Sequence, residues 1–141
     1  MKTLRPTLFL LLLGLAVHVG AEPVVVVNAS NVTQQLSHDQ VVNIFLGRYR
    51  SLPSGGAATP IDQPESSALK TEFYRKLVNK EPNEINAYWS RLIFSGKTLP
   101  PLQTTSSSDV VALLINNPGA IAYMERGLVD KRFRIVMEFQ R

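Results

Sequence analysis

Four consecutive valines, Val24 to Val27, limit how this chain can fold more than any other feature of the sequence. β-Branched residues favour strands, and no polar residue alternates with these four, so the strand needs cover on both faces. Further strands are predicted at residues 58–61, 120–123 and 133–139, with helical patterns between them. This alternation predicts an α/β fold in which helices flank a central, mostly parallel sheet.

Four helices are predicted from capping residues and apolar periodicity. Ser37 and Gln40 form a capping box before a short helix that Gly47 closes. In a later helix, Tyr88 and Trp89 recur at helical spacing with aliphatic neighbours, and we interpret them as core rather than as a platform for a sugar. The starts of the other three helices are predicted at Ser66 or Ser67, at Pro82, and at Ser107 or Ser108.

The N-terminal residues resemble a secretory signal. Lys2 and Arg5 precede an apolar run from Leu8 to Val17, and Val19 and Ala21 are spaced as positions −3 and −1 of a cleavage site. The alternative is an uncleaved anchor, but the run has about half of the roughly 20 apolar residues that a membrane span needs. We therefore expect cleavage after Ala21, export to the periplasm, and a single domain at residues 22–141 that does not span the membrane.

Composition and motifs argue against several classes of function. Cysteine is absent, which excludes disulfides, thiolate metal sites and cysteine nucleophiles. The formal net charge of +4 loses two positive charges with the signal, and Lys131, Arg132 and Arg134 are better explained as a protected strand edge than as a nucleic-acid site. The two histidines, His18 in the signal and His38 at a helix start, form no cluster, and no nucleophile elbow, Walker loop or dinucleotide fingerprint occurs. The sequence predicts no enzyme, no catalytic or metal-binding residue, no cofactor and no nucleic-acid partner.

One turn could bind an anion. Residues 62–65 lead into the helix that begins near Ser66, and first-turn amides together with the helix dipole attract negative charge. The hydroxyls of Ser66 and Ser67 could add donors. The alternative is that these serines only cap the helix, which is their commonest role.

Three segments resemble phosphate ABC-transporter substrate-binding proteins. Val24–Asn28 and Leu36–Gly47 are similar to the strand and the L-S/T-x-x-Q-V/L-x-x-I-F-x-G helix of that family, and Asn117–Tyr123 is similar to its P-G-A-I-G-Y turn. Asp62–Ala68 stands where the family carries its phosphate loop, R-S-D-G-S-G-T. A full member has two lobes and about twice this length. The resemblance therefore implies one lobe of a periplasmic-binding-protein-like fold.

The phosphate loop differs from the family pattern. Asp62 stands at the arginine position and Glu65 replaces a glycine, so the local charge is reversed. Ser66 matches the family's serine and Ser67 stands at a glycine position, and these two serines are the only candidate anion ligands. The resemblance implies a solute-binding-like protein that holds phosphate or another small anion weakly if at all. The alternative is a module that has lost its ligand and binds another envelope protein or a second copy of itself.

Overall fold

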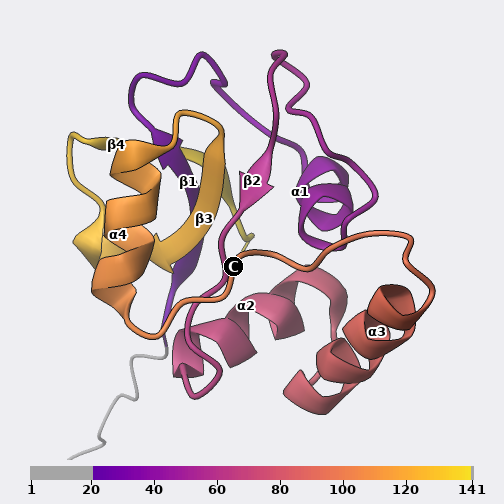
Figure 1. Ribbon diagram of the computed structural model, residues 1–141. Coiled ribbons are helices and arrows are strands. Elements are labelled where there is room, and N and C mark those ends of the chain that lie inside the picture. The colour runs from indigo at the N-terminus through magenta and orange to yellow at the C-terminus, as the bar shows by residue number, and fades with distance from the viewer. Residues whose placement is uncertain (1–20, 141) are drawn as a thin grey trace, which may run out of the picture.

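The valine run forms β1 (Pro23–Asn28), one of the two inner strands of a four-stranded sheet. Figure 1 shows this computed structural model, which describes residues 21–140. The predicted signal segment lies outside the described residues except for its last residue, Ala21. The remaining elements are, in chain order, α1 (His38–Phe45), β2 (Thr59–Pro60), α2 (Ala68–Val78), α3 (Pro82–Phe94), α4 (Ser107–Asn116), β3 (Ala120–Glu125), the 3₁₀ turn η1 (Arg126–Leu128) and β4 (Phe133–Glu138).

The α/β class and the flanked sheet are confirmed, but the sheet is mainly antiparallel rather than parallel. The strand order is β2-β3-β1-β4, and β1 runs antiparallel to both β3 and β4, while only β2 and β3 are parallel. The apolar run was a correct sign of cover on both faces. It carries no information on the direction of neighbouring strands, because burial and hydrogen-bond pattern are separate properties of a strand.

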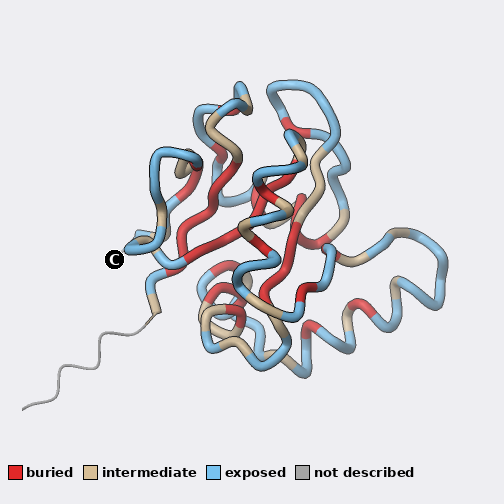
Figure 2. Tube along the Cα trace, turned by 60° about the vertical axis from the view of Figure 1, so that its left-hand side comes forward, coloured by how far each residue is buried: buried red, intermediate tan, exposed pale blue. Residues whose placement is uncertain are grey.

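The sheet is the middle of three layers. Val25 and Val27 face a core formed with α1, α2 and α3, whereas Val24 and Val26 face a smaller core under α4. Figure 1 shows α4 alone on one side of the sheet, and Figure 2 shows the buried strands between helices that are exposed on their outer sides. All four valines have no exposed surface.

Both outer strands of the sheet are partly covered by loop backbone. Beside β2, the N–H of Leu102 donates to the carbonyl of Pro60 at 2.9 Å, and the N–H of Asp62 donates back to Leu102 at 2.8 Å. Beside β4, the N–H of Leu36 donates to Val136 at 2.8 Å, where the register against β1 shifts. Loop backbone is therefore hydrogen-bonded to each outer strand, at Pro60 of β2 and at Val136 of β4.

The helix starts agree with the predicted caps except at α4. Ser37 accepts from the N–H of Gln40, and the Gln40 side chain accepts from Ser37, which completes the capping box. Ser106 caps α4, where Ser107 or Ser108 was predicted. The N-cap residue has extended rather than helical backbone, and the sequence alone does not show which of the three successive serines adopts it.

The interpretation of Tyr88 and Trp89 as core is supported by their packing. Trp89 is buried, and the partly buried Tyr88 donates its hydroxyl to the carbonyl of Leu46 at 2.6 Å.

No helix within residues 21–140 has the length and hydropathy needed to span a membrane.

Candidate anion-binding site

The segment from Asp62 to Ser67 is a turn that delivers the chain from the sheet into α2. The N–H of Asp62 is fixed to Leu102 next to β2, and the N–H of Ser67 donates to the carbonyl of Pro64 at 2.9 Å. Ser67 then caps α2 by accepting from the N–H of Lys70 at 3.4 Å. Ser66 lies exposed one residue before the cap. The predicted placement of this stretch, as a turn before a helix on a sheet, is therefore correct.

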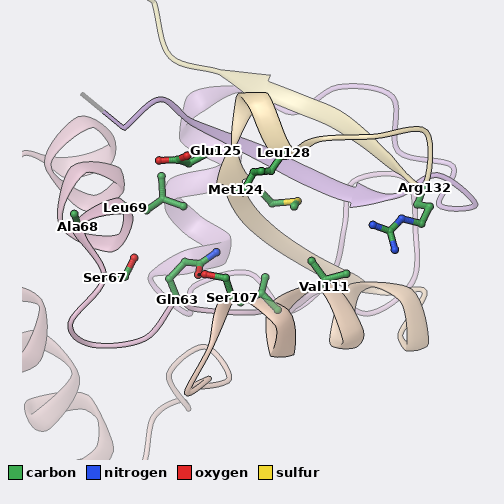
Figure 3. Close-up of a pocket in the computed structure, with 11 residues that line it drawn as sticks. Gln63, Ser67, Ala68, Leu69, Ser107, Val111, Met124, Glu125, Leu128 and Arg132 are labelled. Carbon is green, nitrogen blue, oxygen red and sulfur yellow. Dashed lines mark hydrogen bonds between the residues drawn. The ribbon is translucent and has the colours of Figure 1, made fainter. Parts of the chain in front are cut away.

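A groove of about 510 Å³ runs from the start of α2 to the start of α4. Figure 3 shows Ser67 and Ser107 entering it from these two helix starts, with Gln63 between the two elements. Ser67 lines the groove, whereas Ser66 does not. Its walls are otherwise mainly apolar and comprise Ala68, Leu69, Val110, Val111, Met124 and Leu128, with Glu125 and Arg132 farther along.

Both helix starts can present amide protons to this groove. The first amides of any α-helix have no acceptor inside the helix, and the helix dipole makes that end partially positive. Ser67 and Ser107 carry hydroxyls beside these amides. An anion in the groove could therefore receive hydrogen bonds from two helices at once.

Gln63 connects the two helix starts to the sheet, and sequence reasoning did not identify it. It is buried, its amide nitrogen donates to the carbonyl of Tyr123 at 3.0 Å, and its amide oxygen accepts from the hydroxyl of Ser107 at 3.4 Å. The Gln63 N–H also points to the Tyr123 hydroxyl at 3.2 Å. Position in the turn next to Asp62 was the only sequence signal for this role.

Glu65 is held beside the start of α2 by two donors. Its carboxylate accepts from Lys70 at 2.8 Å and from Asn86 at 2.9 Å. The hydrogen bond from Lys70, followed by that from Asn86, lowers the pKa of Glu65. Glu65 is therefore charged at neutral pH, but Lys70 offsets its charge, and Ser67 rather than Glu65 caps α2.

Asp62 turns away from solvent into the core. Its carboxylate accepts from the hydroxyls of Tyr74, at 3.0 Å, and Tyr123, and Lys70 Nζ lies 3.4 Å away. Burial raises the pKa of Asp62, while Lys70 and the two hydroxyls oppose that rise. Burial, followed by the charge of Asp62, raises the pKa of Tyr74 and Tyr123 well above the usual value, so both phenols keep their protons and act as donors.

Neither Asp62 nor Glu65 lines the groove, whereas Arg132 is a charged side chain that does. Its guanidinium pairs with Asp130 at 2.8 Å, and the hydrogen bond from Arg132 lowers the pKa of Asp130 to about 2. Amides and hydroxyls are thus the main donors that the groove offers to an anion. Among residues 21–140, no group of three or more His, Asp or Glu side chains is placed to hold a metal ion.

Comparisons with known proteins bear on the fold. No protein-family model matches the sequence, and no curated protein matches it either. Among solved structures, an ABC-type phosphate transport receptor from Vibrio cholerae is 17% identical with a TM-score of 0.65, and the match covers 85% of this chain and 49% of that one. A structure described as a phosphate ABC transporter substrate-binding protein with bound phosphate, from Clostridium perfringens, is 15% identical with a TM-score of 0.65, and the match covers 82% of this chain and 44% of the other.

The chain spans about half the length of the solved structures that it matches. At these identities the likeness concerns the fold, and it agrees with the resemblance seen in the valine strand, the capping-box helix and the Pro118–Gly119 turn. The described chain has the α/β fold of about half of a phosphate-type substrate-binding protein.

Proposed function

We propose that this protein is an exported, solute-binding-like domain that holds a small anion, nominally phosphate, in the groove between α2 and α4. The observation that carries the proposal is the convergence of two helix starts, with Ser67 and Ser107, on one groove. Ser66, the exposed residue before Ser67 in the turn, is kept as a further candidate donor. The fold shared with phosphate-type binding proteins supports a solute-binding role over an enzymatic one.

The expected affinity is low for two reasons. The groove is open to solvent, so hydrogen bonds to an anion compete with water. The nearby cations are already engaged, because Lys70 contacts two carboxylates and Arg132 contacts Asp130. We expect a dissociation constant of about 1 mM or weaker, which corresponds to roughly −4 kcal/mol.

Calorimetric titration of the purified protein with phosphate and sulfate tests this function. Ser107→Ala should weaken binding several-fold, because the Ser107 hydroxyl, which donates to Gln63 at 3.4 Å, would turn to the anion, and a neutral hydrogen bond contributes about 1 kcal/mol. Ser90→Ala, at an exposed position of α3, is the matched control and should leave binding unchanged. The absence of both heat and a thermal shift at about 20 mM of either anion, well above the expected constant, would remove the proposal.

We also propose that the protein is periplasmic after cleavage following Ala21, leaving the domain 22–141. The tripartite pattern of the first 21 residues supports this location. Mass measurement of the protein recovered from the periplasm should give an N-terminus at Glu22. A mass that still includes residues 1–21 would favour the uncleaved anchor.

A second candidate, a protein-interaction module, is favoured by exposed apolar side chains at the end of α3. Phe94 is 95% exposed, and Ile93 and Leu99 are also exposed. Single exposed apolar residues are common, whereas neighbouring ones that together form an apolar patch mark contact surfaces. If a second copy binds here, sedimentation should detect a dimer that Phe94→Ser dissociates, whereas a monomeric wild type would exclude self-association.

A further inference from the structure

Three hydrogen-bond donors converge on one buried point beneath the start of α2. Lys70 and Tyr74 lie one helical turn apart on α2, and Tyr123 lies on β3. The Asp62 carboxylate occupies the point at which they meet: one oxygen accepts from Tyr123, and the other accepts from Tyr74 at 3.0 Å and faces Lys70 Nζ at 3.4 Å. A cation and two hydroxyls around a carboxylate are the donor set that protein sites use for free anions.

The donors are positioned independently of Asp62. The rings of Phe73 and Tyr123 are stacked with centroids 3.8 Å apart, and the rings of Phe73 and Tyr74 meet edge to face at 5.1 Å. The Tyr123 hydroxyl also accepts from the N–H of Gln63, so its own proton is left to point at the carboxylate. Lys70 is held from its other side by Glu65. Removing the carboxylate would therefore leave three oriented donors in a buried space.

The backbone of Asp62 is fixed by contacts that do not involve its side chain. Its N–H donates to Leu102 at 2.8 Å, and its carbonyl accepts from the hydroxyl of Thr104 at 2.7 Å. The side chain can therefore be shortened with little change in the path of the main chain. The space that remains would have the size of the missing carboxyl or carboxymethyl group.

We infer that Lys70, Tyr74 and Tyr123 form an anion-binding site that the chain fills with its own Asp62 carboxylate. The class of ligand that this site takes is a small monocarboxylate, because the space was shaped around a planar carboxyl group. None of these three donors lines the groove proposed to hold a solute anion, so this site does not depend on that proposal. Asp62 acts as a permanent internal ligand, which keeps a solute anion out of the buried donors.

Chemical rescue of a shortened side chain tests the inference. Asp62→Ala lacks a carboxylate, which formate can replace, and Asp62→Gly lacks a carboxymethyl group, which acetate can replace. In about 100 mM sodium formate, the melting temperature of purified Asp62→Ala should rise by roughly 5 °C or more relative to sodium chloride of equal ionic strength. Wild type should not show this formate-specific rise, because its site is filled.

Two control variants show whether the three donors bind the added anion. Asp62→Asn keeps the volume of the side chain and should show no rescue. Asp62→Ala combined with Tyr123→Phe should lose most of the formate effect, because one donor is missing. If Asp62→Ala does not fold in chloride, formate should restore its circular dichroism signal.

Two results would overturn the inference. The first is equal behaviour of Asp62→Ala in formate and chloride, including a failure of formate to restore folding. The second is an equal formate effect in wild type or in Asp62→Asn. Because these measurements use formate rather than phosphate, they stay separate from success or failure of the phosphate titration.

Discussion

Replacing Lys70 with methionine should strongly destabilise the protein at neutral pH, because it leaves Asp62 buried without a cation. Lys70 and Asp62 expose only 7% and 2% of their side chains, and removal of one partner from a buried ion pair typically costs about 3–5 kcal/mol. The unpaired Asp62 carboxylate can lose its charge by binding a proton. From the usual pKa of 3.8, protonation at pH 7 costs about 4 kcal/mol, at 1.36 kcal/mol per pH unit, and it costs less in the folded protein because burial already raises the pKa of Asp62. The expected loss for Lys70→Met is therefore about 2–4 kcal/mol, with the cost of protonation from the usual pKa as its upper limit.

The pH dependence of this loss follows from the same reasoning. Without Lys70 the pKa of Asp62 in the folded protein rises further above its unfolded value, so the destabilisation grows as the pH increases. At pH 5 the cost of protonation from the usual pKa is only about 1.6 kcal/mol, and the loss should shrink below that value.

Urea unfolding at pH 7 and pH 5 measures both losses. Lys76→Met is the matched control on the same helix, because Lys76 faces Glu72 at 3.9 Å on the surface and should cost less than about 0.5 kcal/mol. Lys70→Met combined with Asp62→Asn should recover most of the stability, since no buried charge is then left unpaired. A loss below about 1 kcal/mol for Lys70→Met, or simple additivity in the double variant, would refute an ionised pair at this position.

Two further predictions concern a turn and a titration. Gly119→Ala should lower the unfolding free energy by about 1–3 kcal/mol in urea titrations, because its Cβ would lie 2.4 Å from the carbonyl oxygen of Ala57. Gly127→Ala meets nothing within 4 Å and should be nearly neutral, and equal losses would contradict the steric explanation. Between about pH 3 and pH 7, the unfolding free energy of wild type relative to that of Asp62→Asn should fall as the pH rises through the folded pKa of Asp62, because burial raises this pKa above 3.8. The unfolding free energy of wild type relative to that of Glu65→Gln should instead fall as the pH drops through the folded pKa of Glu65, because the hydrogen bond from Lys70 lowers this pKa below 4.5. Two differences that change in the same direction with pH would contradict these assignments.

Local sequence signals predicted much of the fold. The valine run correctly indicated a strand covered on both faces, and the Ser37–Gln40 box correctly placed the start of α1. These features depend on residues that are neighbours in the chain. Strand direction depends on which distant segments pair, and the antiparallel contact of Val25 with Tyr123 leaves no mark on the valines themselves.

The candidate site was predictable only in part. The turn before α2 and the cap at Ser67 follow from local patterns. The cluster around Asp62 does not, because Tyr123 lies 61 residues away and Tyr74 reads as an ordinary apolar position of a helix. Because Asp62 stands where the family has an arginine, the sequence predicted a reversed charge at the turn. The structure instead places the Asp62 carboxylate in the core, and the sequence alone does not show which way this side chain points.

The loop backbone bonded to Pro60 at one margin of the sheet and to Val136 at the other has a consequence for assembly. A strand brought by another molecule would have to displace Leu102 or Leu36 before it could add to the ladder. Any companion, whether a second lobe or a second copy, is thus expected to dock through side chains rather than by lengthening the sheet. The same obstruction protects the apolar strands from stacking edge to edge into fibrils.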